Sequence, residues 1–301
     1  MAAVVYGAPP PELAPVPAGA VQASPLVPGA AALEDAPDAS LDEAVVAAPA
    51  GALERRYVLA QALRALKGGG RLTALAPKDR GGLRLKAELE AFGCQVEAGG
   101  RRHWRVAACR RPDAPAGRAT AIAEGGPQVP PGLGLASQPG VFSWDRPDPG
   151  TALLARHVGG LAGAGADLGC GVGVLALAAL AEPAVTRLAL VDIDRRAVAA
   201  ARRNVADPRA SFLQADLREA APLAGLDFVA MNPPFHLDGA EDRTLGQLFI
   251  RRAAAMLRRG GLCRLVANVA LPYETPLREA FAAVTLLDQA HGYKVYEARK
   301  R

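Results

Sequence analysis

Apolar and polar positions follow two different patterns over the second half of the chain. Short apolar runs such as LALVD (188–192) and FVAM (228–231) predict buried strands, and stretches such as RRAVAAARRNV (195–205) repeat apolar residues with a helical period. Strands that alternate with helices predict a doubly wound, mostly parallel sheet, here of seven strands. A short His-Gly turn separates the last two apolar stretches, 284–290 and 292–300, so these predict an antiparallel hairpin at the end of the sheet.

A Pro- and Gly-rich stretch divides the chain in two. Residues 112–138 have no sustained period, which is typical of a linker. At 301 residues the chain is long enough for two domains of ordinary size. We therefore expect a first domain over 1–111, a linker over 112–138 and a second domain over 139–301.

The first domain repeats the final part of the second domain's pattern. Four blocks align in the same order: 41–51 with 226–236, 57–76 with 247–267, 85–93 with 277–285, and 103–111 with 293–301. Chance similarity of two alanine-rich halves is the alternative, but four ordered blocks favour duplication. The first copy reads AAPA at 47–50 where the second reads NPPF at 232–235, and nothing before it resembles a glycine loop. We predict that the first half is a shortened, degenerate copy of the α/β fold.

Charge is unevenly distributed along the chain. Residues 1–50 contain six acidic and no basic side chains, whereas residues 51–118 contain fifteen basic and six acidic side chains. Positive charge gathered in one region attracts a polyanion through counterion release, which favours a nucleic acid as the partner. Solvated, arginine-rich faces are the alternative interpretation.

Other features of the composition exclude several classes of protein. No apolar run approaches the roughly 18 residues that a membrane span needs, and the N-terminus has no basic region typical of a secretion signal. The four cysteines and four histidines are scattered without a CxxC pair. We expect a cytoplasmic monomer with no metal site and no contact with a membrane.

Glycines cluster at one junction of a strand and a helix, in ADLGCGVGVL (166–175). Asp167, Gly169, Gly171 and Gly173 stand two residues apart, and glycines there let the backbone turn sharply and approach a ligand. The dinucleotide fingerprint needs a glycine at the position that Val174 occupies. The spacing therefore disfavours a nicotinamide-dependent oxidoreductase, which also lacks a candidate His or Tyr acid in this sequence.

Acidic residues end the next two predicted strands. Asp192 lies twenty-one residues beyond Gly171, where it can accept hydrogen bonds from the ribose hydroxyls of a nucleoside cofactor. Asp194 is predicted to begin the following helix as its N-cap. Asp216 ends the third strand and can accept from an adenine amino group, although a turn or capping carboxylate would have the same position.

These motifs together resemble the class I, Rossmann-like methyltransferases that use S-adenosylmethionine to modify amino groups. Four segments, PGVFSWDRPDPG, NPPFH, GGLCRLVANVALPY and YKVYEARK, resemble more narrowly the ribosomal RNA guanine-N2 methyltransferases of the RsmC family, which acts on 16S RNA, with the RlmG type on 23S RNA as near kin. The similarity covers 139–301 well and 41–111 more loosely. Members of that family have a first methyltransferase-like domain without a cofactor site, as the duplication predicts here.

The resemblance implies a function and further site residues. It implies methyl transfer from S-adenosylmethionine to the exocyclic amino group of a guanine, with ribosomal RNA or the small ribosomal subunit as partner, by the domain at 139–301. Phe142 and Asp148 match the family's segment beside the cofactor, although a linker aromatic packed on the domain is the alternative for Phe142. The basic first half is then a candidate platform for RNA.

The strand over 228–231 ends abruptly at Asn232, Pro233, Pro234, Phe235 and His236. A guanine amino group has its lone pair delocalised into the ring, so two acceptors aimed at its N–H bonds would localise that pair. The Asn232 side-chain oxygen and the Pro233 carbonyl are the candidates, and the two prolines hold them in place beforehand. Phe235 is predicted to stack on an extruded base, and His236 receives no role.

Two other interpretations remain open. Protein glutamine and DNA adenine methyltransferases also have Asn-Pro-Pro followed by an aromatic ring, although tyrosine is the commoner ring there. An RNA-binding assembly protein on an inactive methyltransferase scaffold would predict damaged motifs in the second domain, and none is visible.

Overall fold

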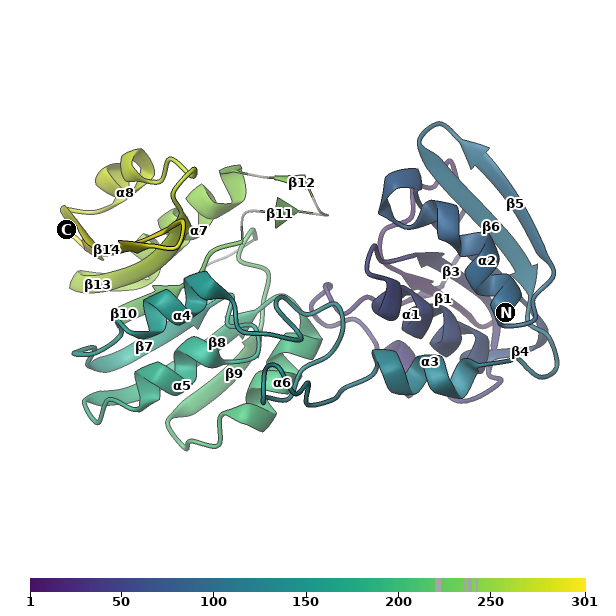
Figure 1. Cartoon of the computed structure of the whole chain (residues 1–301), viewed down its shortest axis with the longest axis horizontal. Helices are drawn as coiled ribbons and strands as arrows, with labels where there is room; N and C mark the ends of the chain where they lie inside the picture. The colour runs from purple at the N-terminus through teal and green to yellow at the C-terminus, as the bar shows by residue number, and fades with distance from the viewer. Residues whose placement is uncertain (220–222, 235, 238–239, 242) are drawn as a thin grey trace. The chain divides into compact units, whose positions relative to one another are not determined.

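The computed structural model describes residues 1–219, 223–234, 236–237, 240–241 and 243–301 (Figure 1). The chain divides into two compact units. The N-terminal unit comprises Met1–Gln128 with Gln138–Gly140, and the C-terminal unit comprises Val129–Ser137 with Val141–Arg301. Within the described residues, every helix is too short or too polar to traverse a lipid bilayer.

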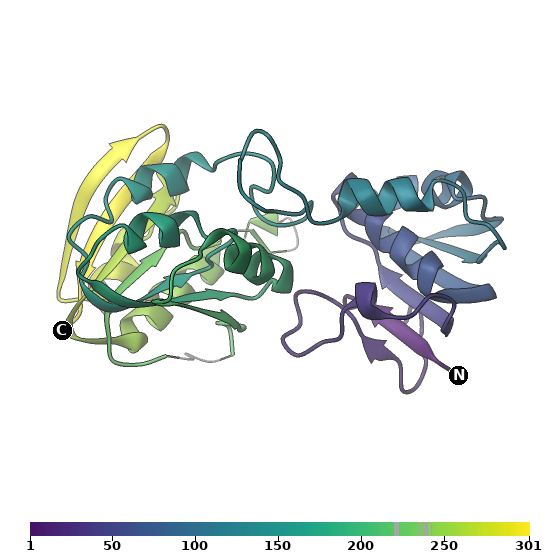
Figure 2. The same ribbon diagram turned by 90° about the horizontal axis from the view of Figure 1, so that it is seen from below.

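A seven-stranded sheet forms the centre of the C-terminal unit. Its order is β14-β15-β13-β10-β7-β8-β9, and the strands are β7 (Gly163–Leu168), β8 (Val185–Asp192), β9 (Ala210–Gln214), β10 (Leu226–Met231), β13 (Leu257–Asn268), β14 (Ala283–Ala290) and β15 (Tyr293–Arg299). All neighbours are parallel except β15, which is antiparallel to both β13 and β14. The predicted fold class is confirmed, including the terminal hairpin, which Figure 2 shows in yellow at one edge of the sheet.

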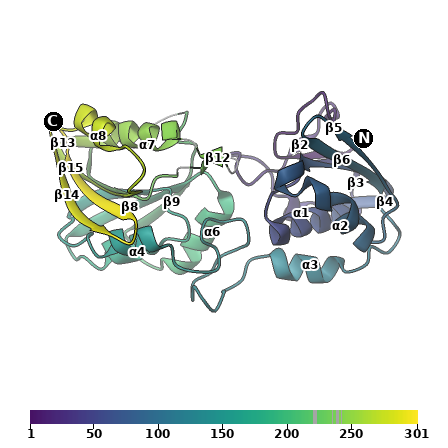
Figure 3. The same cartoon turned by 45° about the horizontal axis from the view of Figure 1, so that its top comes forward.

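Helices cover both faces of this sheet (Figure 3). One face carries α4 (Pro149–Ala155), α5 (Val174–Leu180) and α6 (Arg195–Asn204), and the other carries α7 (Arg243–Met256) and α8 (Glu274–Ala280). Successive residues of β10 enter opposite cores: Phe228 packs on the α5–α6 side, whereas Val229 and Met231 pack on the α7–α8 side. The chain order reverses at β7, which lies between β8 and β10, and ligands of such sheets bind at this point beyond the carboxyl ends of the strands. A small ladder, β11 (His236–Leu237) with β12 (Ala240–Glu241), follows β10.

The N-terminal unit contains a six-stranded sheet of the order β2-β1-β3-β4-β6-β5. The strands are β1 (Ala3–Tyr6), β2 (Val21–Gln22), β3 (Leu41–Ala47), β4 (Leu66–Pro77), β5 (Val96–Arg101) and β6 (Trp104–Arg110). Its helices are α1 (Ala52–Ala65), α2 (Leu85–Ala91) and α3 (Arg118–Gly125), with 3-10 turns η1 (Leu33–Asp35), η2 (Lys78–Arg80) and η3 (Gly82–Arg84). The first four strands are parallel and the hairpin β5–β6 is antiparallel, as in the larger sheet.

The two sheets correspond strand by strand. In both units a parallel strand, a 14-residue helix and a 12-residue strand follow one another, as β3, α1 and β4 or as β10, α7 and β13. Both β3 and β10 pair with the next parallel strand through a register shift after their first residue, Leu41 in one unit and Leu226 in the other. This register makes Ala47 the counterpart of Asn232, as the block alignment predicts.

The later blocks align differently from the prediction. The turn residues Arg102 and His291 both have positive φ (55° and 51°), which moves the last block by one residue. Phe92 and Phe281 are the buried C-caps of α2 and α8, which moves the third block by three residues. Alanine-rich helices of similar composition align almost equally well in several registers, so only the packed aromatic rings and the turns distinguish them.

Part of the expected linker is helical. Residues 118–125 form α3, which packs against α1 and buries Ala121 in the core of the N-terminal unit. The division between the units falls near residues 128–141.

Candidate active site

The glycine loop joins β7 to α5. Gly169, Gly171 and Gly173 all have positive φ, at 73°, 51° and 94°. Residues other than glycine rarely adopt a positive φ, so the loop needs glycine at these positions. The Gly171 amide donates to Asp192 Oδ2 at 2.9 Å, which ties the loop to the end of β8.

Asp192 stands where the sequence predicts a ribose ligand. Its second oxygen, Oδ1, accepts from the Asp194 amide at 2.9 Å, and burial raises the pKa of Asp192 to about 6. Asp194 is the N-cap of α6, as predicted: its side chain accepts from the Arg196 amide and forms a buried ion pair with the Arg196 guanidinium.

Asp167 is buried at the end of β7 with 1% of its surface exposed. Neither of its carboxylate oxygens has a hydrogen-bond partner within 3.5 Å among the described residues, although the Ala176 amide is near enough to lower its pKa slightly. Burial and, secondly, the nearby Asp192 carboxylate raise the pKa of Asp167 to about 7. A buried carboxylate without a partner is costly, so it marks a place where a ligand would complete the site.

Asp216 follows β9, and in this structure it pairs with a neighbour. Its carboxylate accepts from the Arg218 amide at 2.8 Å and forms a 2.7 Å ion pair with Arg218 Nη2. The Arg218 side chain holds the pKa of Asp216 below its usual range. These contacts are those of a carboxylate in a turn. The contact of Asp216 with an adenine amino group remains a prediction.

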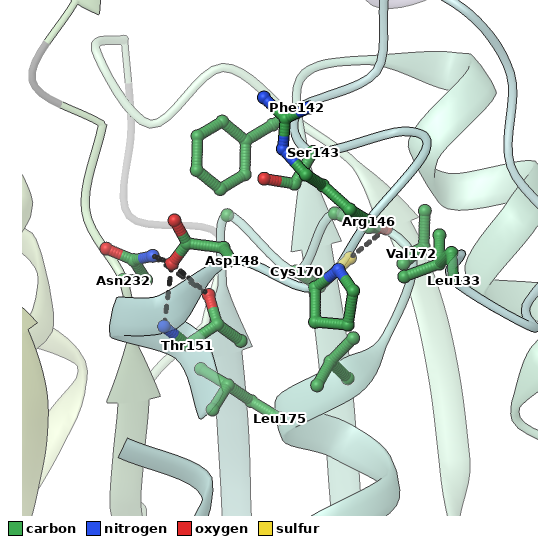
Figure 4. Close-up of a pocket in the computed structure, with 14 residues that line it drawn as sticks. Leu133, Phe142, Ser143, Arg146, Asp148, Thr151, Cys170, Val172, Leu175 and Asn232 are labelled. Atoms are coloured by element: carbon green, nitrogen blue, oxygen red, sulfur yellow. Dashed lines mark hydrogen bonds between the residues drawn. The ribbon is translucent and has the colours of Figure 1, made fainter. Parts of the chain in front are cut away.

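The end of β10 carries an amide that is held from one side (Figure 4). Asn232 Nδ2 donates to Asp148 Oδ2 and to Thr151 Oγ1, at 2.9 Å each. A carboxylate oxygen can only accept, so Nδ2 must face Asp148 and Oδ1 must face away from it. Figure 4 shows Oδ1 directed away from both partners, and no described residue donates to it.

The two prolines extend this strand end. Pro233 is buried and Pro234 is partly buried. Phe235, the predicted base platform, lies outside the described residues, and for His236 only the backbone, in β11, is described.

Phe142 and Asp148 line one pocket together with Asn232, Gly169 and Gly171. Phe142 is 59% exposed, so it is not a packed linker aromatic. Figure 4 shows its ring on the side of the pocket toward which the Asp148 carboxylate points. The structure thus brings the glycine loop, the strand end and the segment before α4 into one site.

Sequence reasoning missed Thr151. It lies three residues after Asp148, and the Asp148 side chain caps α4 by accepting from the Thr151 amide at 2.7 Å. The spacing Asp-x-x-Thr before an apolar helix signals such a cap. The contact of the Thr151 hydroxyl with Asn232, eighty-one residues away in the chain, has no local signal.

Comparison with known proteins places this arrangement in a family. The model of the Methyltransferase small domain family matches residues 132–297. The Ribosomal RNA small subunit methyltransferase C of Pseudomonas putida (strain KT2440) is 35% identical over 280 residues, which are 88% of this chain and 81% of the relative. The protein of the same name from Pseudomonas aeruginosa (strain LESB58) is 34% identical over 272 residues, 88% of this chain and 81% of its own. The chain belongs to the ribosomal RNA small subunit methyltransferase C family.

A solved structure of the same family supports the fold over both units. The T. thermophilus 16S rRNA N2 G1207 methyltransferase (RsmC), in complex with AdoMet and guanosine, matches with a TM-score of 0.79 and 27% identity. The match covers all of this chain and 88% of that one. The family resemblance recognised from the sequence is confirmed, and so is the class I methyltransferase fold preceded by a second, smaller sheet.

Proposed function

We propose that the protein transfers a methyl group from S-adenosylmethionine to the exocyclic amino group of a guanine in 16S ribosomal RNA. The observation that carries this proposal is the Asn232 amide beside the pocket, whose Nδ2 is engaged by Asp148 and Thr151 so that Oδ1 points away from both and can accept from a substrate (Figure 4). An oxygen in that position can accept a hydrogen bond from an N–H group, so it suits a methyl acceptor that is an amine. The names of the family members above support the same acceptor and cofactor.

The residues that line the pocket and the acidic residues at the ends of β8 and β9 fit S-adenosylmethionine. Asp192 would accept from the ribose hydroxyls, Asp216 from the adenine amino group once it releases Arg218, and the loop from 169 to 173 would cradle the cofactor through its backbone. Phe142 and Asp148 would line the methionine end.

The bound cofactor supplies an activated methyl group on sulfur. The chain's own task is to prepare the amine, and Asn232 Oδ1 with the Pro233 carbonyl would each accept one N–H bond of the amino group. The nitrogen lone pair would then be localised for attack on the methyl carbon that the bound cofactor presents, with the sulfur as the leaving group. The product aminium releases its proton to water, so no general base is needed. Removal of one preorganised polar group of this kind costs about 2.7 to 4 kcal/mol in other enzymes.

The base must leave its stack to reach this pocket. We propose that Phe235 stacks on it, in a contact worth roughly 1 to 3 kcal/mol in single-strand binders. His236 receives no role in proton transfer.

We further propose that the N-terminal unit helps to bind the RNA. The exposed Arg101 and Arg102 lie at the tip of the β5–β6 hairpin, and the Lys78 amide donates to the His103 carbonyl at 2.8 Å. This bond brings the exposed Lys78 beside the tip from a distant part of the sequence. Cations gathered in this way suit a phosphate backbone. A cytoplasmic location and a monomeric state remain predictions.

A labelling experiment tests the proposed function. The protein is incubated with radiolabelled S-adenosylmethionine and, separately, with small subunits, large subunits, deproteinised ribosomal RNA, DNA and a release factor. We expect label in small-subunit 16S RNA, recovered as N2-methylguanosine after digestion. Label in 23S RNA, DNA or the release factor would overturn the proposed substrate, and no label in any pool would overturn the proposed activity.

A further inference from the structure

We propose that Thr151 is a positioning residue for methyl transfer, which works with Asp148 to hold the Asn232 amide in its productive orientation. This inference rests on the proposed function, because it concerns the amide that would accept from the substrate. Thr151 itself contacts neither the proposed acceptor atom, Asn232 Oδ1, nor the glycine loop through any bond in the structure.

The three side chains form a closed set of hydrogen bonds. Thr151 Oγ1 accepts from Asn232 Nδ2 at 2.9 Å and donates its own hydrogen to Asp148 Oδ2 at 3.0 Å. Asp148 Oδ2 also accepts from Asn232 Nδ2 at 2.9 Å and from the Thr151 amide at 2.7 Å. Nδ2 therefore donates into a pair of acceptors that are themselves hydrogen-bonded to each other, and the direction of every bond follows from the carboxylate, which can only accept.

The orientation matters because an asparagine amide has two ends of almost the same shape. With Oδ1 directed away from Asp148 and Thr151, as in the structure, the amide can accept from an amino group, but after a half turn it presents Nδ2–H bonds to that group and repels it. A valine at 151 would have nearly the same shape as threonine and would remove one of the two acceptors that favour the productive orientation. Asp148 would remain as the second acceptor.

The rest of the chain holds Thr151 in place. Thr151 is the third residue of α4, whose N-cap is Asp148. Leu153 and Leu154 of the same helix are buried in a cluster with Val266 of β13 and Val295 of β15. The helix is thus packed on the sheet, and the bonds of Thr151 and Asp148 link it to the end of β10.

The test compares Thr151→Val with Thr151→Ser in the full chain, using small subunits or whichever RNA accepts label. We expect Thr151→Val to lower kcat by roughly 10- to 100-fold, because a misplaced catalytic group commonly costs that much. The KM for RNA, the Kd for S-adenosylmethionine and the Tm should stay close to those of the unchanged protein. Thr151→Ser restores the hydroxyl and should restore most of kcat. If Thr151→Val fails to fold, Thr151→Ala takes its place against the same serine control.

Three results would overturn the inference: an unchanged kcat in Thr151→Val, equal losses in the valine and serine variants, or a loss that lies in the Kd for S-adenosylmethionine. A parallel assay of Asn232→Ala separates the inference from the proposed function. If Asn232→Ala is inactive while Thr151→Val is fully active, only the positioning role fails. If Asn232→Ala is itself active, the proposed role of the amide fails, and the positioning role fails with it.

Discussion

The two units hold their sheets together through the same bonds. Asp42 in the N-terminal unit accepts from the Ala2 amide, just before β1, and Asp227 in the C-terminal unit accepts from the Ala164 amide, at the start of β7, at 2.7 Å in both cases. Each also accepts from a cation at the start of the parallel strand paired with its own, Lys67 of β4 in one unit and Arg258 of β13 in the other. The amino ends of the strands are therefore built alike.

The carboxyl ends of the strands differ in every polar residue of the site. By the register of the paired strands, the site residues have these counterparts: Val5 for Asp167, Ser24 for Asp192, and Ala47 for Asn232. Of the loop glycines only Gly169 has one, Gly7, which follows β1 with a φ of 75°. The framework of the fold persists without the site, so the polar residues of the C-terminal unit are not needed to form the sheet.

Side chains of the N-terminal unit occupy the backbone groups that a ligand would use. Gln22 donates to the Gly7 carbonyl and accepts from the amides of Ala23 and Ser24, at 2.8 to 2.9 Å. The C-terminal unit instead leaves Asp167 buried without a partner among the described residues. The comparison indicates that a binding site keeps costly unpaired groups, which the copy without a site has replaced.

The largest effect on stability is expected from Arg55, whose side chain occupies the strand end of the N-terminal unit that corresponds to the site. Arg55 is 3% exposed, pairs with Glu88 through two 2.7 Å bonds, and donates to the carbonyls of Pro49 and Ala50, the counterparts of Pro234 and Phe235. Arg55→Met leaves the partly buried Glu88 without its cation, and this should lower the free energy of unfolding of this unit by about 3 kcal/mol, the lower end of the range for a buried pair. Urea denaturation followed by hydrogen exchange measures the loss.

The double variant Arg55→Met, Glu88→Leu is the matched control. It removes both charges, so most of the stability should return. The Kd of the C-terminal unit for S-adenosylmethionine should not change in either variant. If Arg55→Met alone is as stable as the unchanged protein, Arg55 does not stabilise this end of the N-terminal unit.

The next largest effect is the loss of kcat expected when Asn232 is replaced by alanine, the residue at its counterpart Ala47. Asn232→Ala makes the C-terminal site resemble the N-terminal one, and we expect kcat to fall by about 100- to 1,000-fold, the usual result of removing one preorganised polar group. Cofactor affinity, measured by calorimetry, should be nearly unchanged. Ala47→Asn is the control, and it should leave the methylation rate as it was. Retained turnover in Asn232→Ala would count against the mechanism.

Sequence patterns predicted the parts of the site that depend on local sequence. The apolar run before Asn232, the glycines from 169 to 173 and the acidic end of β8 are each signalled by a few neighbouring residues, and the structure brings the glycine loop close to both strand ends. The Thr151 hydroxyl could not be found in this way, because its contact with Asn232 exists only after α4 packs on the sheet.

Short secondary-structure elements could not be predicted either, because their sequences carry too little local signal. β1 and β2 have four and two residues, too few for a period to be visible, so the sequence did not reveal that the N-terminal unit retains counterparts of β7 and β8. Helix α3 lies between Pro- and Gly-rich segments, so the composition around it predicts a linker. Its packing on α1, which buries Ala121, is what keeps it in the unit.

A third prediction compares Asp192 with Ser24. Both accept from the amide two residues ahead, Asp194 at 2.9 Å and Leu26 at 3.2 Å, but only Asp192 also binds the glycine loop. Asp192→Ala should weaken the binding of S-adenosylmethionine by about 10- to 100-fold, the usual scale for hydrogen bonds to a charged group. Calorimetry measures it, with Ser24→Ala as the control. Unchanged affinity in the first variant would exclude the ribose role.

A smaller effect concerns the pH dependence of stability. Burial raises the pKa of Asp167 to about 7, so between pH 4 and pH 7 the folded chain binds a proton that the unfolded chain has lost. The stability contributed by this group is therefore present below pH 4 and decreases as pH rises through 7. Asp167→Asn removes that loss, and the Tm of the ligand-free protein at pH 8 should rise by a few degrees, for roughly 1 to 2 kcal/mol.

The same measurement contains its own control. Near pH 4 both carboxyl and amide are neutral, so the two proteins should have nearly equal Tm values there. Asp192, whose pKa burial raises to about 6, remains in the variant and should preserve part of the pH dependence. A Tm difference that is the same at pH 4 and pH 8 would show that the gain does not come from the charge of Asp167.

The smallest effect tests whether the copy without a site has a task of its own. Arg101 and Arg102 lie in the exposed hairpin tip of the N-terminal unit, and their replacement by glutamate should weaken RNA binding. If each arginine neutralises one phosphate, the slope of log K against log salt should become shallower by about 0.7 to 0.9 per residue. Arg187→Glu with Arg203→Glu, two exposed arginines of the C-terminal unit, changes the net charge equally and serves as the control. Equal slopes for both pairs would mean that the tip is merely solvated, and that the N-terminal unit differs from the C-terminal unit in what it has lost but not in what it binds.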